Sequence, residues 1–259
     1  MNIVVCIKQA PDTEAPIKVK DGAPGIVRDG VKLEISPYDE FALETALRLK
    51  EQHGGTVTAL ALGPDRVKES LRKALSVGAD KAVLVSDAAL AGADGHGVAL
   101  ALSKAIGRLG CDLVIVGKKA VGVDRGQVGP QLAQMLGLPF VSQAAVVESA
   151  DARTLRVERE IEGGREVLEL DLPGVVSVDK TAHELRHAGL KGIMAAKTKP
   201  IEVLALAALE LSADDVKPRI AVRATQPPAP RQAGRIIAGD AATAAKELVR
   251  LLHDEAKVV

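Results

Sequence analysis

The sequence CDLVIVGKKAVGVDRGQVGPQ, residues 111–131, decides the fold. It begins with an apolar, β-branched run at residues 113–116, which predicts a buried strand that Gly117 closes. It leads into one face of a helix formed by Val128, Leu132, Met135 and Leu136. A strand that reaches a helix N-terminus through a glycine-containing loop favours phosphate binding, because backbone N–H groups and the helix dipole point at the anion. A loop that only turns the chain is the alternative interpretation.

The same alternation of strand and helix precedes this segment. Strand-like runs lie at residues 3–7, 56–62 and 82–85, and helical patterns follow them, the first with Ser36 as its cap and Pro37 in its first turn. The order predicts an α/β fold with a doubly wound, mainly parallel sheet. Ligands of such sheets bind at the carboxyl ends of the strands.

The pattern changes after residue 140. Short apolar runs at residues 141–147, 155–161 and 167–172 predict antiparallel hairpins, and residues 175–178 predict one more strand of the main sheet. A short hairpin is also expected within residues 14–35. The fold class is therefore α/β with an antiparallel hairpin region.

A domain of residues 1–200 and a C-terminal arm of residues 201–259 are predicted. Residues 181–200 show no clean period, and the arm is rich in proline before it ends in an amphipathic helix at about residues 240–254. The uncovered apolar stripe of that helix indicates contact with a partner. A helix that folds back on its own domain is the alternative.

Composition restricts the class of protein. Hydrophobic residues make up 47% of the chain and aromatic residues 1%, so the core is built from Ala, Val, Leu and Ile, as in parallel sheets. Lys plus Arg and Asp plus Glu each number 34, so no net basic charge indicates nucleic acid. No apolar run is long enough to be embedded in a membrane, and no leader precedes the first strand, which predicts a cytoplasmic protein.

Motifs for catalysis or metal binding are absent from the sequence. His183 and His187 are spaced i, i+4, but no third ligand accompanies them. The G-x-S-x-G, G-x-x-x-x-G-K-[ST] and G-x-G-x-x-G patterns are missing as well. We therefore expect no catalytic residue and no metal, and a role in holding a nucleotide or cofactor is favoured.

Several collinear motifs carry a family resemblance. They are VEREIEGGREVL at 157–168, PGVV at 173–176, VVCIKQAPDT at 4–13, SPYDE at 36–40, GLKGIMAAK at 189–197 and PPAPRQAG at 227–234. Together they cover essentially the whole chain and resemble the electron transfer flavoprotein beta subunit family. Without the resemblance, the charged cluster around Glu160 would be interpreted as a solvated hairpin.

The resemblance implies a heterodimer with an alpha subunit that holds most of the redox-active FAD. The beta subunit would bind AMP, and electrons would pass from dehydrogenases, of the acyl-CoA type that serve fatty acid beta-oxidation, to a quinone-linked oxidoreductase. This role is that of an electron carrier rather than an enzyme. Two alternatives stay open: an electron-bifurcating subunit with a second FAD in place of AMP that oxidises NADH, and a free-standing adenine-nucleotide-binding protein.

The resemblance also implies functional residues. The nucleotide contacts lie at strand ends and in the opening loop: Cys6, Ser36, Pro37, Tyr38, Asp39, Leu62, Gly117, Lys118, Lys119, Ala120, Val121, Gly122, Val123, Asp124, Arg125, Gly126, Gln127 and Val128. Leu190 would be the apolar anchor that docks redox partners, together with Ile193 and Met194. Glu160 matches a carboxylate that restrains the flavin domain of the partner subunit.

The chain departs from the family pattern at several of these positions. Gly122 stands where an aspartate is usual, Arg125 where a threonine is frequent, and His187 where the docking segment has an aromatic residue. The sequence QVGPQ at 127–131 is similar to the electron-bifurcating branch. AMP and FAD therefore both remain candidates for the nucleotide.

Overall fold

The computed structural model describes residues 1–20, 22–149, 151, 153–180, 183–231 and 233–259. Thr181 and Ala182 of the segment predicted without a clean period lie outside the described residues, as does Gln232 of the predicted arm. No helix among the described residues combines the length and the apolar character that crossing a bilayer requires.

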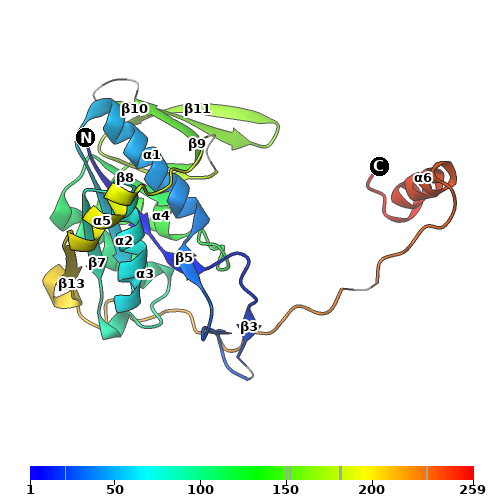
Figure 1. Cartoon of the computed structure of the whole chain (residues 1–259), viewed down its shortest axis with the longest axis horizontal. Coiled ribbons are helices and arrows are strands. Elements are labelled where there is room, and N and C mark those ends of the chain that lie inside the picture. The colour runs from blue at the N-terminus through cyan, green and yellow to red at the C-terminus, as the bar shows by residue number, and fades with distance from the viewer. Residues whose placement is uncertain (21, 150, 152, 181–182, 232) are drawn as a thin grey trace.

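A nine-stranded sheet organises the chain, in the order β11-β10-β9-β12-β8-β1-β6-β7-β13 (Figure 1). In this spatial order, each pair of neighbours from β9 through β12, β8, β1, β6 and β7 to β13 is parallel. Strand β10 pairs antiparallel with both β9 and β11. Both the doubly wound parallel sheet and the antiparallel hairpin region are thus confirmed. The strands are β1 (Asn2–Ile7), β6 (Thr56–Leu62), β7 (Lys81–Val85), β8 (Leu113–Gly117), β9 (Phe140–Ser149), β10 (Thr154–Ile161), β11 (Gly164–Asp171), β12 (Gly174–Val178) and β13 (Ile201–Leu204).

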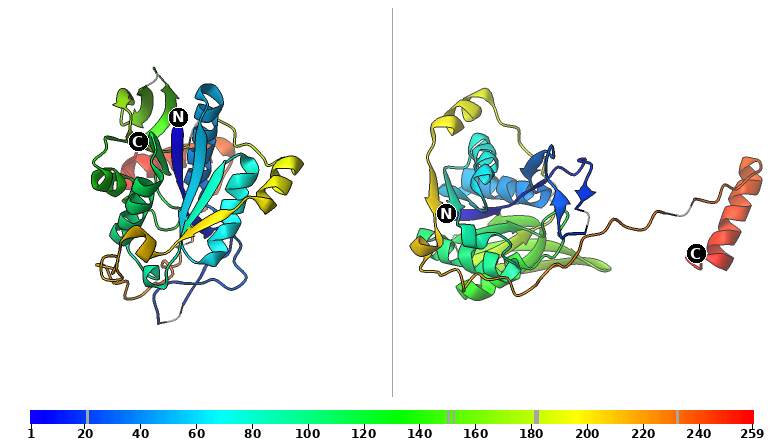
Figure 2. Two further views of the ribbon diagram at one scale, coloured as in Figure 1. Left: turned by 90° about the vertical axis from the view of Figure 1, so that its left-hand side faces the viewer. Right: turned by 90° about the horizontal axis from the view of Figure 1, so that it is seen from below.

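Helices cover both faces of the parallel part of the sheet (Figure 2). The alternation of side chains along β1 shows this, because Val5 packs in one apolar cluster and Val4 in the other. One cluster lies under α1 (Pro37–His53) and α2 (Lys68–Val77), and α5 (Leu190–Thr198) packs on α2. The other lies under α3 (Gly95–Leu109) and α4 (Val128–Leu136).

Short elements complete the domain. The hairpin expected within residues 14–35 is formed by β3 (Lys18–Val19) and β4 (Ile26–Val27). A second small ladder joins β2 (Gln9–Pro11) to β5 (Leu33–Ile35) and carries the chain into α1. Single 3₁₀ turns are η1 (Asp65–Val67), η2 (Ala88–Leu90) and η3 (Leu206–Leu209).

Two local predictions differ from the structure. Ser36 occupies the N-cap position of α1 and Pro37 is its first residue, as predicted, but the Ser36 hydroxyl makes no capping bond; its Oγ instead lies 3.5 Å from the Val121 amide. The segment before residue 200, for which no period was found, contains helix α5. That helix has a weak apolar pattern because most of its side chains are exposed and only Ala196 is buried.

The chain leaves the sheet later than residue 201, where we expected the arm to begin. Strand β13 pairs in parallel with β7, and Val216 is fully buried beneath α3 and η3. The Arg219 amide then donates to the Asp94 carboxylate at 2.7 Å, and Thr225 Oγ1 accepts from the Gly25 amide at 2.8 Å. Residues 201–216 therefore pack on the domain, with Leu204, Leu206, Leu209 and Val216 buried.

The C-terminal helix stands apart from the domain (Figure 1). It comprises α6 (Ala241–Arg250) and a π-helical turn, η4 (Leu251–Glu255), as the sequence pattern predicted. Asp240 caps α6 by accepting from the Thr243 amide at 2.9 Å. All residues of α6 are described and none is buried, so the helix does not fold back on the sheet.

Candidate nucleotide-binding site and docking surface

The candidate site lies where the direction of the sheet reverses. From β1 the chain adds β6 and β7 on one side, and then returns to place β8 on the other side of β1. The connections after β1 and β8 therefore diverge to opposite faces, and doubly wound sheets bind their ligands at the carboxyl ends of such a strand pair; we call this place the crevice. Gly117 closes β8 at this edge, and Leu62 closes β6 one strand further along.

Asp39 joins the ends of β1 and β8 from the first turn of α1. Its Oδ2 accepts a hydrogen bond from the Lys8 amide at 2.9 Å, and its Oδ1 accepts from the Gly117 amide at 3.1 Å. The residue is 6% exposed. Burial raises the pKa of the Asp39 carboxyl to about 7, although both backbone bonds favour its charged form. The carboxyl thereby fixes how the two strand ends lie relative to each other.

Glycine is required at position 117 by this arrangement. A Cβ atom there would lie 2.3 Å from Asp39 Oδ1 and 2.9 Å from the Tyr38 carbonyl carbon. Both neighbours belong to the start of α1, which cannot retreat without breaking the bridge to β1. The crevice thus depends on the missing side chain of Gly117.

Ion pairs hold the lysines that follow β8. The Lys118 ammonium lies 2.6 Å from the carboxylate of Asp179, which follows β12, and the Lys119 ammonium lies 3.2 Å from Asp124 within the same loop. Each ammonium also lies 6.0 Å from the centroid of the Tyr38 ring. The structure therefore brings together the two predicted segments at residues 36–39 and 117–121.

The remainder of the loop exposes its backbone. Residues 122–127 are all exposed, and φ is positive at Gly122 (81°), Asp124 (53°) and Gly126 (59°). In the part of the chain that the structure describes, no hydrogen bond is formed by the backbone N–H groups of residues 126–129. Free N–H groups at the N-terminus of α4 are the donor set that a phosphate requires, so these residues fit a phosphate group.

Positive charge gathers at the same edge. Desolvation lowers the pKa of the Lys8 ammonium; the Asp39 carboxylate opposes this shift, and the charges of Arg125 and Arg28 add to it. Lys8 and Asp179 were not among the predicted site residues. Their positions directly after β1 and β12 are the signal that could have identified them, since carboxyl ends of parallel strands meet at one edge.

Other predicted contacts lie beneath the crevice. The Cys6 side chain is 8% exposed and packs in the apolar cluster under α3 and α4, together with Leu62 and Val128. Burial raises the pKa of its thiol, so Cys6 contributes packing rather than a thiolate nucleophile. Among the described residues, no group of three His, Cys, Asp or Glu side chains is placed to hold a metal ion.

The predicted docking residues form two separate surfaces. Leu190, Ile193 and Met194 are 78%, 42% and 57% exposed and share the outer face of α5, which we call the α5 patch. Glu160 lies on β10, where its carboxylate is 3.7 Å from the Arg165 guanidinium of β11. Because β10 and β11 lie at the opposite end of the sheet from β7, Glu160 and the α5 patch are widely separated.

Comparison with known proteins gives the family. The family model described as "Electron transfer flavoprotein domain" matches residues 25–209, which include Asp39, the loop after β8, the β10–β11 hairpin and α5. The electron transfer flavoprotein subunit beta of Bacillus subtilis is 37% identical over 260 residues, and the match covers 100% of both chains. The chain belongs to the electron transfer flavoprotein beta-subunit family. Its resemblance to that family, predicted from the collinear motifs, is thereby confirmed.

Other members of the beta-subunit family show comparable similarity. The Thermoanaerobacterium thermosaccharolyticum protein of the same description is 38% identical over 257 residues and 98% of each chain. The protein FixA of Sinorhizobium fredii is 41% identical over 223 residues, which cover 83% of this chain and 77% of FixA.

Proposed function

We propose that this chain is the beta subunit of a heterodimeric electron transfer flavoprotein. It binds AMP in the crevice between β1 and β8 and docks redox partners at the α5 patch. Electrons then pass from dehydrogenases, of the acyl-CoA type, through an FAD held mainly by the alpha subunit to a quinone-linked oxidoreductase. The observation that carries the proposal is the Asp39 bridge, which in a member of this family opens a crevice onto the N-terminus of α4.

Different residues of the crevice contact different parts of AMP. The free N–H groups at the start of α4 and the charge of Arg125 suit its phosphate. The Tyr38 ring, with Lys118 and Lys119 beside it, borders the same opening. AMP supplies no redox chemistry when bound, so in this role the nucleotide is structural.

Docking follows from the exposure of α5. A leucine that is 78% exposed at the start of a fixed helix is suited to insert into an apolar pocket of a partner. Glu160 contributes a separate electrostatic contact with the flavin-bearing subunit, and salt would weaken that contact because the side chain is exposed. The chain acts as a carrier subunit and contributes no acid, base or nucleophile.

The arm and α6 provide the contact with the alpha subunit. The apolar stripe of α6 and η4 includes Leu248 and Leu251 and is not covered by the domain. An amphipathic helix at the end of an extended segment suits binding in a groove of another chain. A cytoplasmic location stays a prediction from the sequence.

A second FAD in the crevice is the other candidate. Residues 122–127 are exposed, and position 122 carries no side chain, so the loop leaves room beyond a mononucleotide. Such a subunit would take part in electron bifurcation with NADH as the donor.

Mass spectrometry of the small molecules released from the co-expressed heterodimer tests both candidates. AMP together with one FAD per heterodimer supports the proposal, and two FAD without AMP select the bifurcating subunit. A stable monomer that retains an adenine nucleotide but co-purifies with no flavoprotein would favour the free-standing nucleotide-binding protein. Absence of any adenine nucleotide would refute the crevice as its site.

A further inference from the structure

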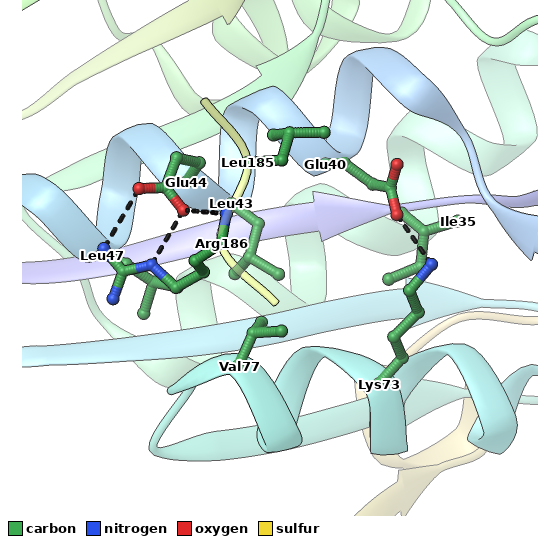
Figure 3. Close-up of a pocket in the computed structure, with 9 residues that line it drawn as sticks. All are labelled: Ile35, Glu40, Leu43, Glu44, Leu47, Lys73, Val77, Leu185 and Arg186. Atoms are coloured by element: carbon green, nitrogen blue, oxygen red, sulfur yellow. Dashed lines mark hydrogen bonds and ion pairs between the residues drawn. The ribbon is translucent and has the colours of Figure 1, made fainter. Parts of the chain in front are cut away.

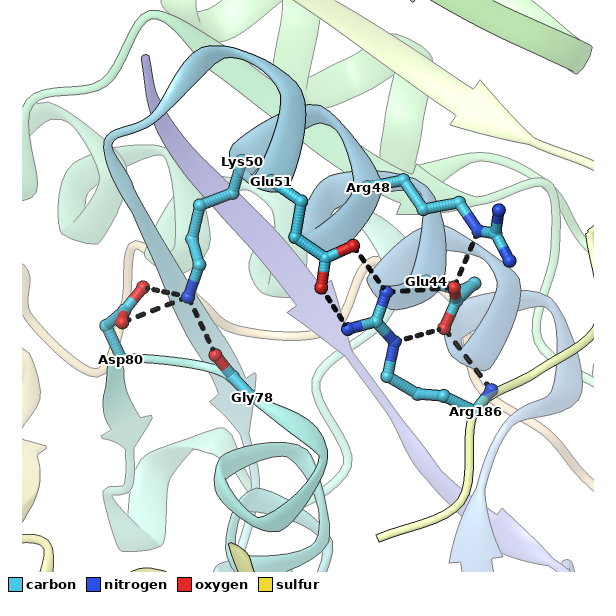
Figure 4. Close-up of polar contacts among 7 residues, drawn as sticks. All are labelled: Glu44, Arg48, Lys50, Glu51, Gly78, Asp80 and Arg186. Carbon is cyan, nitrogen blue, oxygen red and sulfur yellow. Dashed lines mark hydrogen bonds and ion pairs between the residues drawn. The ribbon is translucent and has the colours of Figure 1, made fainter. Parts of the chain in front are cut away.

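Arg186 fastens the segment before α5 to helix α1 (Figure 4). Its guanidinium donates to Glu44 at 2.8 and 3.1 Å and to Glu51 at 2.5 and 3.1 Å. Its backbone N–H also lies 3.3 Å from Glu44 Oε2. A guanidinium held by two carboxylates of one helix has a single orientation, because its donors form a rigid planar fork.

The Glu44 carboxylate depends on this contact. Its side chain is 2% exposed, and the other cation that reaches it is Arg48, at 2.7 Å from within the same helix. Burial acts to raise the pKa of Glu44, but the hydrogen bonds from Arg186 and Arg48 outweigh it and lower the pKa. A buried charge held mainly by one arginine makes the position of that arginine costly to change.

The residue before Arg186 is held by apolar contacts. Leu185 lines the groove between α1 and α2, opposite Leu43, Leu47 and Val77 (Figure 3). The chain at this point is therefore attached by a side chain in the groove and by the ion pairs next to it.

Helix α5 is attached independently to α2. A Cβ atom at Gly192 would lie 2.2 Å from the Ser76 carbonyl oxygen, so the two helices touch backbone to backbone there. The Arg72 guanidinium donates to the carbonyl oxygens of Ala196 and Lys199 at the far end of α5. Both ends of the helix are thus fixed.

Leu190 lies between these two attachments. Only residues 187–189 separate it from Arg186, and one residue separates it from Gly192. At about 3.5 Å per residue, so short a connection gives Leu190 little freedom to move once both neighbours are fixed. The backbone from which the exposed Leu190 side chain projects is therefore held on both sides.

We propose that Arg186 is a positioning residue for partner docking: its ion pairs with Glu44 and Glu51 fix the direction in which Leu190 projects from the surface. The inference rests on the proposed function, since it concerns the α5 patch as the docking surface. In this proposal Arg186, on the inner side of the segment, provides the preorganisation that Leu190 requires as an apolar anchor.

The test uses the heterodimer co-expressed with its alpha subunit and a purified acyl-CoA dehydrogenase, reduced by its substrate, as electron donor. Arg186→Gln is expected to raise the KM of the dehydrogenase for the heterodimer about tenfold, with a smaller change in kcat, because the docking anchor is disturbed. Arg48→Gln is the matched control, because it removes a cation from the same Glu44 cluster without touching the segment. We expect it to change KM less than about twofold.

A double-mutant cycle separates positioning from general destabilisation. If Arg186 acts through Leu190, the variant Arg186→Gln/Leu190→Ala has the KM of Leu190→Ala alone, whereas independent effects would multiply. Multiplying effects, or an unchanged KM in Arg186→Gln when Leu190→Ala raises it, overturn the inference and leave the proposed function intact. An unchanged KM in Leu190→Ala would refute docking at α5 and the positioning role together.

Hydrogen exchange supplies a readout besides electron transfer. Arg186→Gln is expected to speed amide exchange in residues 187–192 while exchange in α4 stays as in the wild type. Should that variant fail to fold, Glu51→Gln removes the more exposed of the two carboxylates and should give the same changes at smaller size. Unchanged exchange in residues 187–192 would contradict the proposal.

Discussion

The carboxyl of Asp39 accepts the amide hydrogen of Gly117 at 3.1 Å, although these residues lie far apart in sequence. Its other oxygen accepts a hydrogen bond from the Lys8 amide. A side chain in the first turn of α1 thus spans the point at which the sheet reverses direction. The candidate nucleotide site is therefore built around a buried acid that no ligand needs to touch.

Substitution of Gly117 should damage the crevice directly. Gly117→Ala places a Cβ atom 2.3 Å from Asp39 Oδ1, and we expect a loss of about 1–3 kcal/mol in the free energy of unfolding. Bound nucleotide should be lost as well. Gly107→Ala is the control, because position 107 lies in α3 with nothing within 4 Å of the added atom. Urea denaturation and nucleotide analysis check both variants, and equal stabilities would rule out the steric account.

Stability should depend on pH through Asp39. Its pKa is about 7 in the folded protein and 3.8 ordinarily, so between these values the folded state binds more protons than the unfolded state. The resulting stabilisation is complete below about pH 4 and is lost as pH rises toward 7, with a difference of about 2 kcal/mol between pH 5 and 7. Asp39→Asn should lack this component. Parallel pH profiles of unfolding free energy for the two proteins would contradict the assignment.

Nucleotide binding by the loop before α4 can be tested by replacing two glycines that have similar positive φ angles. Gly126→Ala and Gly137→Ala both force alanine into the left-handed region, at φ of 59° and 66°, at opposite ends of α4. Each should cost about 1–2 kcal/mol of stability. Only Gly126→Ala disturbs the free N–H groups, so it alone should lower the nucleotide content of the purified heterodimer. An equal loss from Gly137→Ala would show that nucleotide content follows stability rather than the loop.

The contact between α5 and α2 should tolerate no side chain at position 192. Gly192→Ala brings a Cβ atom within 2.2 Å of the Ser76 carbonyl oxygen, so α5 must lift, and the rate of electron transfer from an acyl-CoA dehydrogenase should fall. The loss should be about tenfold if the α5 patch contains the anchor of the interface. Gly189→Ala, three positions earlier, meets nothing within 4 Å and is the matched control. A similar rate in both variants would mean that the close helix contact does not govern docking.

The role of α6 can be tested by charge placed on its two faces. Leu248→Asp introduces a carboxylate into the apolar stripe and should abolish co-purification with the alpha subunit. Lys246→Asp places the same carboxylate on the polar face, two residues away, and should leave the heterodimer intact. Because α6 makes no buried contact with the domain, both chains should keep wild-type melting temperatures. Retention of the partner by Leu248→Asp would exclude the stripe as its contact.

Local patterns were sufficient for most of the fold. The apolar runs that became β1, β6 and β8 are continuous because these strands are covered on both faces, and glycines end the helices that follow. Helix α5 was missed, since it is held by Gly192 and Arg72 against α2 rather than by an apolar stripe of its own. β13 was assigned to the arm because its exposed edge gives a weak strand pattern.

The candidate site was predicted in outline but not in its chemistry. The loop at residues 117–128 and the turn at residues 36–39 could be located, because strand ends and helix starts have local signatures. The resemblance implies that Asp39 contacts the nucleotide from the start of a helix, where acidic residues are usually exposed. Its burial depends on β1 and β8 meeting beside it, and such long-range packing leaves no mark in the local sequence. The ion pairs of Arg186 escaped notice for the same reason.

The position of α6 affects how long a complex would last. The residues between Val216 and Ala241 join a packed domain to a helix that makes no buried contact with it. A domain tethered in this way to a helix seated on another chain keeps a local concentration on the order of millimolar, even when its own interface opens. If α6 binds the alpha subunit as proposed, the domain can move away to meet a redox partner and return while the helix keeps the two subunits together.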